Sequence, residues 1–141
     1  MFQQMTIVGN LGNDPEMRFM PDGTAVTNFS VATNRRWKDE NGDPVDETCW
    51  FRCSAWGRTG EVINEFFEKG KPILIVGRMI PDPQTGGPRI YQRQDGSAGS
   101  SFELRVLSWS FLPSSREEGS YDGGGHSAGS RAPVEEDEIP F

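Results

Sequence analysis

The chain has 141 residues, a formal net charge of −7, two cysteines and one histidine. This length suits one domain with a tail. The two cysteines do not make a disulfide scaffold, because Cys49 and Cys53 would lie roughly 13 Å apart along one strand. With His126 as the single histidine, we expect no metal and no other cofactor. The sequence lacks a long apolar run and a secretory signal pattern, so we expect a cytoplasmic protein that meets no membrane.

The charge is unevenly distributed along the chain. Residues 1–115 hold 12 Lys/Arg and 14 Asp/Glu, whereas residues 116–141 hold 2 Arg and 7 Asp/Glu. Most of the negative charge therefore lies near the C-terminus. The nearly neutral body can carry a basic face, and a nucleic-acid partner is not excluded.

Apolar spacing predicts the elements of the body in chain order. We expect strands at 5–11, 25–37 and 48–56, then a helix at 59–69, then strands at 72–80 and 101–112. In the last strand the apolar positions change face between Val106 and Trp109, which predicts a bulge and assigns Trp109 to packing. Five strands with a helix between the third and fourth are typical of an all-β OB-fold barrel.

The helix has recognisable ends. Thr59 is expected to cap its N-terminus, Glu61 suits its first turn and Lys69 its last, and Gly70 and Pro72 end it. These features place one helix between the third and fourth strands of a domain that covers residues 1–112.

Connections outside these elements are polar or rich in glycine. We expect loops at 38–47 and 81–100, the second forming a protruding hairpin, and a turn at Gly9-Asn10-Leu11-Gly12. Residues 113–134 predict a disordered, flexible Gly/Ser-rich linker. Residues 135–141 form an acidic tip with an apolar end.

The strand at 48–56 has two unlike faces. One face carries Trp50, Arg52, Ser54 and Trp56, and the other carries Cys49, Phe51, Cys53 and Ala55. Burying the first face would leave Arg52 unpaired in the core, at high cost. Two large aromatic side chains on an exposed face indicate a binding role. Stacking on unpaired bases is such a role, and each stacked base contributes about 1–3 kcal/mol to binding.

Two further segments combine aromatic and basic residues. For each of them, an interpretation without DNA binding fits equally well. Arg35-Arg36-Trp37-Lys38 also suits a solvated strand end, and Arg89-Ile90-Tyr91-Gln92-Arg93 also suits an amphipathic hairpin. Three such clusters in one small domain favour single-stranded DNA as the ligand. The body offers no Ser-His-Asp or Cys-His set, so we expect no enzyme activity.

Several motifs resemble the bacterial single-stranded DNA-binding protein family. They are Val8-Gly9-Asn10-Leu11-Gly12-Asn13-Asp14-Pro15-Glu16-Met17-Arg18-Phe19-Met20-Pro21-Asp22-Gly23, Glu47-Thr48-Cys49-Trp50-Phe51-Arg52, Trp56-Gly57-Arg58, Lys69-Gly70 and Asp137-Glu138-Ile139-Pro140-Phe141. The resemblance implies an OB-fold homotetramer, associated with the nucleoid, that wraps single-stranded DNA. It also implies a tip that docks replication, repair and recombination proteins. Tyr91 stands where the family commonly has tryptophan, and Phe51 where some members have histidine.

The residues and the resemblance together predict two sites. The expected DNA-binding residues are Trp37, Trp50, Trp56, Tyr91, Arg18, Arg35, Arg36, Arg52, Arg58, Lys69, Arg89 and Arg93. The expected partner-binding residues are Glu135, Glu136, Asp137, Glu138, Ile139, Pro140 and Phe141. An acidic run before an apolar end fits a hydrophobic pocket rimmed by cations, although acidic ends also serve solubility alone.

Four other functional hypotheses compete with single-stranded DNA binding. A replication-restart OB protein also binds single strands, but the acidic tip argues against it. An RNA-binding cold-shock-like module lacks both the tail and the long hairpin. A pure interaction hub, whose barrel only forms oligomers, has no need of an exposed tryptophan face. A nuclease needs clustered metal ligands, which the sequence does not offer.

Overall fold

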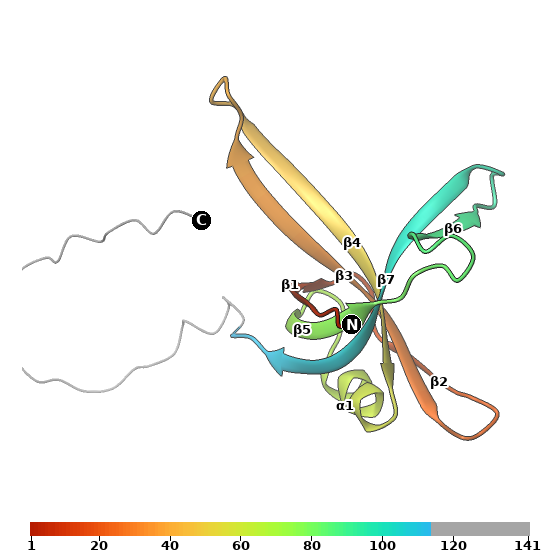
Figure 1. Cartoon of the computed structure of the whole chain (residues 1–141). Coiled ribbons are helices and arrows are strands. Elements are labelled where there is room, and N and C mark those ends of the chain that lie inside the picture. The colour runs from red at the N-terminus through yellow and green to blue at the C-terminus, as the bar shows by residue number, and fades with distance from the viewer. Residues whose placement is uncertain (114–141) are drawn as a thin grey trace, which may run out of the picture.

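The computed structural model describes residues 1–113. Its elements are β1 Met5–Leu11, β2 Glu16–Phe19, β3 Ala25–Lys38, β4 Pro44–Trp56, α1 Arg58–Phe66, β5 Pro72–Met79, β6 Arg89–Gln92 and β7 Ala98–Phe111 (Figure 1). The predicted tip at 135–141, and all of the predicted linker except Pro113, lie outside the described residues.

Five strands close into a barrel. Their order is β1-β5-β7-β4-β3, and β1 pairs with β3 as well, which completes the circle. Strands β4 and β7 run parallel, and the other pairs are antiparallel. In chain order α1 follows the third barrel strand, so the prediction of a five-stranded OB-fold barrel with one helix is confirmed.

Strand β1 depends on a glycine where it crosses β3. A Cβ at Gly9 would collide with the carbonyl oxygen of Ala32, because Asn10 and Ala32 are paired at this crossing. Gly9 therefore lets the two strands approach and the barrel close. The predicted turn at 9–12 was wrong for residues 9–11, which belong to β1.

Two arms project from the barrel, one made by the distal halves of β3 and β4, the other by β6 and β7 (Figure 1). The predicted loop at 38–47 was too long, because β3 and β4 stay paired as far as Lys38 and Pro44, and only residues 39–43 connect them. Cross-strand contacts hold this ribbon, including Asn34 Nδ2 donating to Thr48 Oγ1 at 2.9 Å.

Strand β2, which the sequence did not reveal, pairs with β3 outside the barrel. The protruding hairpin expected within 81–100 is confirmed as the β6–β7 hairpin.

Helix α1 is shorter than expected. It begins after Gly57, which has φ 61° and makes no side-chain cap, so the predicted cap at Thr59 was wrong. The helix ends at Phe66, where Phe67 turns extended and donates its N–H to Ile63 O. Lys69 therefore lies beyond the helix. Gly60 O accepts a buried 2.8 Å hydrogen bond from Thr27 Oγ1, which ties α1 to β3.

The barrel interior is filled by the inward faces of its strands. Phe51, Cys53 and Ala55 are buried as predicted. Both cysteines are free thiols, and burial raises the pKa of Cys49 and raises that of Cys53 to about 12. Within residues 1–113 no helix is long and apolar enough to cross a membrane.

The predicted bulge in the last strand is confirmed. Val76 pairs with Ser108 and the next residue, Gly77, pairs with Val106, so Leu107 is the extra residue on β7. The bulge returns Trp109 to the inner face. Its ring packs edge-on against that of Phe67, with 5.3 Å between centroids, as expected for a packing residue.

Candidate nucleic-acid interface

The outer face of β4 carries large exposed aromatic side chains. Trp50 is 54% exposed and Trp56 37% exposed, and Arg52 between them is also exposed. Their sequence neighbours Phe51, Cys53 and Ala55 point into the core. The alternation predicted for residues 49–56 is therefore the alternation observed.

Strand pairing extends this face over both neighbours of β4. Arg52 lies opposite Ser30 of β3 and Glu103 of β7. Ser54 lies opposite Asn28 of β3 and Arg105 of β7. Since directly paired residues point to the same side of a sheet, these side chains form rows across three strands.

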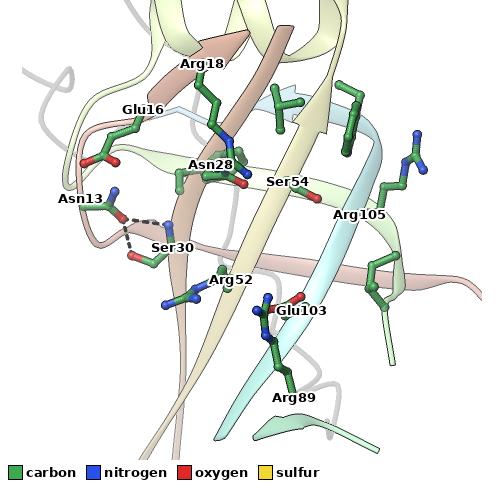
Figure 2. A pocket seen from close by; sticks show the side chains of 14 residues that line it. Asn13, Glu16, Arg18, Asn28, Ser30, Arg52, Ser54, Arg89, Glu103 and Arg105 are labelled. Atoms are coloured by element: carbon green, nitrogen blue, oxygen red, sulfur yellow. Dashed lines mark hydrogen bonds and ion pairs between the residues drawn. The ribbon is translucent and has the colours of Figure 1, made fainter. Parts of the chain in front are cut away.

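The rows line an open cleft with a volume of about 700 Å³ (Figure 2). This volume lies within the range of small-molecule sites. The charged lining side chains are Arg18, Arg52, Arg89, Arg105, Glu16 and Glu103. Four arginines against two glutamates give the cleft a positive balance, although residues 1–113 as a whole are slightly acidic.

Arg105 belongs to this surface, although it is not among the predicted binding residues. Its guanidinium carbon lies 5.1 Å from the ring centre of Trp56, a cation–π contact across two strands. A signal was present, because Leu104 and Val106 read as inward residues and Arg105 between them must point outward. The four uncharged polar lining residues were likewise not among the predicted binding residues; they are Asn13, Asn28, Ser30 and Ser54.

Glycines make room for two of the aromatic rings. A Cβ on Gly12 would collide with the ring of Trp50, so that ring lies against the start of the loop after β1. A Cβ on Gly99 would come within 2.8 Å of the Tyr91 ring, which lies over β7. The guanidinium carbon of Arg52 is 5.9 Å from the Tyr91 ring centre, so the β6–β7 arm and the β4 face meet at this pair.

The β3–β4 ribbon carries a separate aromatic and basic pair. The guanidinium carbon of Arg35 lies 4.7 Å from the Trp37 ring centre. Both residues have odd numbers on β3, whereas the cleft residues Asn28 and Ser30 have even numbers. The alternation of a strand therefore places Trp37 on the other face of the ribbon, and the structure does not bring it to the cleft.

Several predicted cations are already paired with acids. Arg36 lies 2.6 Å from Asp46 on the ribbon. Arg58 lies 3.5 Å from Glu61 at the start of α1. Arg89 lies 3.4 Å from Glu103 within the cleft.

Two further predicted cations also lie away from the cleft. Lys69 is positioned through its backbone N–H, which donates to Asp14 Oδ1 at 2.8 Å. At the turn of the β6–β7 hairpin, Arg93 donates to the carbonyl oxygen of Ala98, also at 2.8 Å. Of the predicted DNA-binding set, the cleft therefore gathers only Arg18, Arg52, Trp56 and Arg89.

Metal-ligating side chains do not cluster in the part of the chain that the structure describes. Across residues 1–113 no three His, Cys, Asp or Glu side chains come together to hold an ion. The absence of a cofactor and of catalysis stays a prediction. What the described surface offers is exposed aromatic rings among arginines, an arrangement that suits stacked bases and phosphates.

Residues 2–112 match the model of the single-strand binding protein family. The chain belongs to this family. It is 34% identical over 129 residues to the single-stranded DNA-binding protein of Wolinella succinogenes, covering 91% of this chain and 75% of that protein. It is 35% identical over 101 residues to the single-stranded DNA-binding protein of Neisseria meningitidis serogroup A, covering 72% of this chain and 54% of that protein.

A solved structure agrees with this assignment. The chain is similar to a deletion mutant of the single-stranded DNA binding protein from Thermus aquaticus, with a TM-score of 0.60 and 26% identity. The match covers 79% of this chain and 51% of that chain. The family resemblance predicted from the motifs is thereby confirmed.

Proposed function

We propose that this member of the single-strand binding protein family binds single-stranded DNA without sequence preference and catalyses no reaction. The observation that supports this most directly is the cleft, where the exposed Trp56 stands among Arg18, Arg52 and Arg105. Aromatic rings stack on any base, and arginines attract the phosphates between bases. Trp50 and Tyr91 extend this surface along β4 and the β6–β7 arm.

Intrinsic tryptophan fluorescence tests this proposal. Titration with single-stranded DNA should quench emission, because bases stack on exposed indole rings. Matched duplex DNA should quench less at the same moderate salt concentration, since its bases are already stacked on one another. An RNA strand of the same sequence serves as a further comparison. Equal affinity for duplex and single-stranded DNA would contradict the proposal.

The finer parts of the proposal concern assembly and cellular role. We propose a homotetramer that protects single strands during replication, repair and recombination, in the cytoplasm at the nucleoid. Exposed apolar residues outside the cleft are consistent with subunit contacts: Val8 on β1 is 54% exposed and Leu107 on β7 is 52% exposed. Light scattering across micromolar concentrations should give a tetrameric mass, and a monomeric mass throughout would contradict this part.

We also propose that residues 135–141 recruit replication, repair and recombination proteins. The support is the order of residues, four carboxylates followed by Ile139-Pro140-Phe141. A partner pocket lined by apolar groups and rimmed by Lys or Arg would bind both halves. A Gly/Ser-rich linker would let the tip reach partners while the barrel stays on DNA.

A further inference from the structure

One side chain that lines the cleft is a carboxamide that makes no hydrogen bond within residues 1–113. Asn28 is half-buried on β3 and lines the cleft beside Ser54, its directly paired residue on β4. Asn13 and Ser30 nearby satisfy each other, because Asn13 Oδ1 accepts from the Ser30 backbone N–H and hydroxyl. Within residues 1–113 the Asn28 side chain makes no such bond. Its polar atoms are available to a ligand in the cleft.

The position of Asn28 relative to Trp56 suggests what that ligand is. Trp56 pairs with Val26, so Asn28 is its diagonal neighbour across the β3–β4 pair. Such diagonal residues lie about 7–8 Å apart, within reach of a planar ring stacked on one of them. A base on Trp56 would therefore present its edge to Asn28 and Ser54.

The surrounding charges favour a base rather than a phosphate at this place. Asn28 and Ser54 carry no charge, and the acidic residue Glu16 lies directly opposite Asn28 on β2. Arg18, Arg52 and Arg105 also line the cleft, and Figure 2 shows Arg18 reaching toward Asn28 from β2. A phosphate is held best by cations. The backbone of a bound strand would run along the arginines, and the uncharged side chains of Asn28 and Ser54, beside Glu16, would be left to a base edge.

Building on the single-stranded DNA binding proposed above, we propose that Asn28 hydrogen-bonds the edge of the base that stacks on Trp56, with Ser54 as a second partner. A carboxamide carries two N–H donors and a carbonyl acceptor. The edge of every base combines donors and acceptors, and unpaired bases are commonly read there. By rotating, Asn28 can bond any base, so this subsite adds affinity without adding sequence preference.

A double-mutant cycle between protein and DNA separates this hydrogen bond from stacking. One change is Asn28→Leu, which keeps the size of the side chain and removes its polar atoms. The other replaces every thymine of a short oligothymidylate by difluorotoluene, a ring of the same shape that stacks but hydrogen-bonds poorly. The analogue should weaken binding to the unmodified protein about fivefold more than it weakens binding to Asn28→Leu, as expected for one neutral hydrogen bond.

Controls keep the outcome unambiguous. Asn34→Leu alters the same residue type on the same strand face, where the carboxamide is already bonded to Thr48, and it should leave the cost of the analogue unchanged. Asn28→Ala should reproduce Asn28→Leu, and thermal unfolding should verify that each variant is folded. The salt dependence of binding should stay the same in all three, since no phosphate contact is removed.

Three results would contradict the proposed base contact, and one of them would also contradict the proposed function. If the analogue weakens binding to the unmodified protein and to Asn28→Leu by the same factor, Asn28 makes no base contact and the inference is wrong, while binding of oligothymidylate still supports the proposed function. If Asn28→Leu instead flattens the salt dependence, the residue serves phosphate binding. If the unmodified protein does not bind oligothymidylate, the proposed function fails and the base contact with it.

Discussion

Replacing Arg105 by glutamine should reduce the salt dependence of DNA binding. Arg105 contacts Trp56 within the cleft, and no carboxylate of residues 1–113 lies within ion-pairing distance of it. Its charge is therefore available to a phosphate. Arg36 offers a matched comparison, because its guanidinium is already neutralised by Asp46 at 2.6 Å, so a phosphate there would have to displace a carboxylate.

The expected size of the effect follows from counterion release. Each phosphate contact on a single strand contributes about 0.7 to the slope of log affinity against log salt. Loss of the Arg105 contact should lower the slope by about 0.7. Between 50 and 200 mM salt, the deficit of Arg105→Gln relative to the unmodified protein should then shrink by about 2.5-fold. For Arg36→Gln we expect less than half of this change.

The assay is fluorescence titration at several salt concentrations with an oligonucleotide short enough to occupy one barrel. A longer strand would contact several barrels and multiply the effect. Thermal unfolding should show that both variants are folded, as expected for substitutions of side chains that reach solvent. The reasoning is refuted if Arg36→Gln flattens the slope as much as Arg105→Gln, or if Arg105→Gln leaves it unchanged.

Three further results are expected. Trp50→Ala should weaken single-strand binding by about 1–3 kcal/mol. Trp109→Ala should instead lower the free energy of unfolding by about 2–4 kcal/mol and leave binding unchanged. Fluorescence titration and urea denaturation would show the opposite pattern if Trp50 packs in the core and Trp109 binds DNA. Burial raises the pKa of the Cys53 thiol from 9.0 to about 12, so the free energy of unfolding should be fully retained below pH 9 and should fall between pH 9 and 12. Urea denaturation should show a smaller fall for Cys53→Ala, and an equal fall would contradict the assignment to Cys53. Deleting residues 135–141 should leave DNA affinity unchanged or slightly higher and should abolish capture of replication and repair proteins. Phe141→Ala should reproduce most of that loss of capture. A truncated protein that still captures these proteins would contradict the recruiting role.

Local patterns determined the parts of this protein that depend on neighbouring residues in the chain. The period-two alternation of residues 49–56 placed Trp50 and Trp56 on an outer face and Cys53 inside, because each strand residue points opposite to the next. The change of face after Val106 predicted a bulge, since only an extra residue can reverse that alternation.

Local patterns failed where an element has no buried face. The start of β4, residues 44–47, reads as a loop because its side chains are largely exposed, so no apolar alternation marks it. Strand β2 is exposed along its whole length for the same reason. The turn at Gly9 was a wrong prediction because a glycine that permits a close strand crossing looks the same in sequence as one that permits a turn.

The sequence by itself determined the barrel, the aromatic face of β4 and the membership in a family. Only the tertiary structure decided which other residues join that face. Arg105 reaches Trp56 because β7 pairs in parallel with β4, about 50 residues away in the chain, and Trp37 is kept from the cleft by its place on the opposite side of the ribbon. Such neighbours depend on how a closed barrel sets strand register, which no local spacing records.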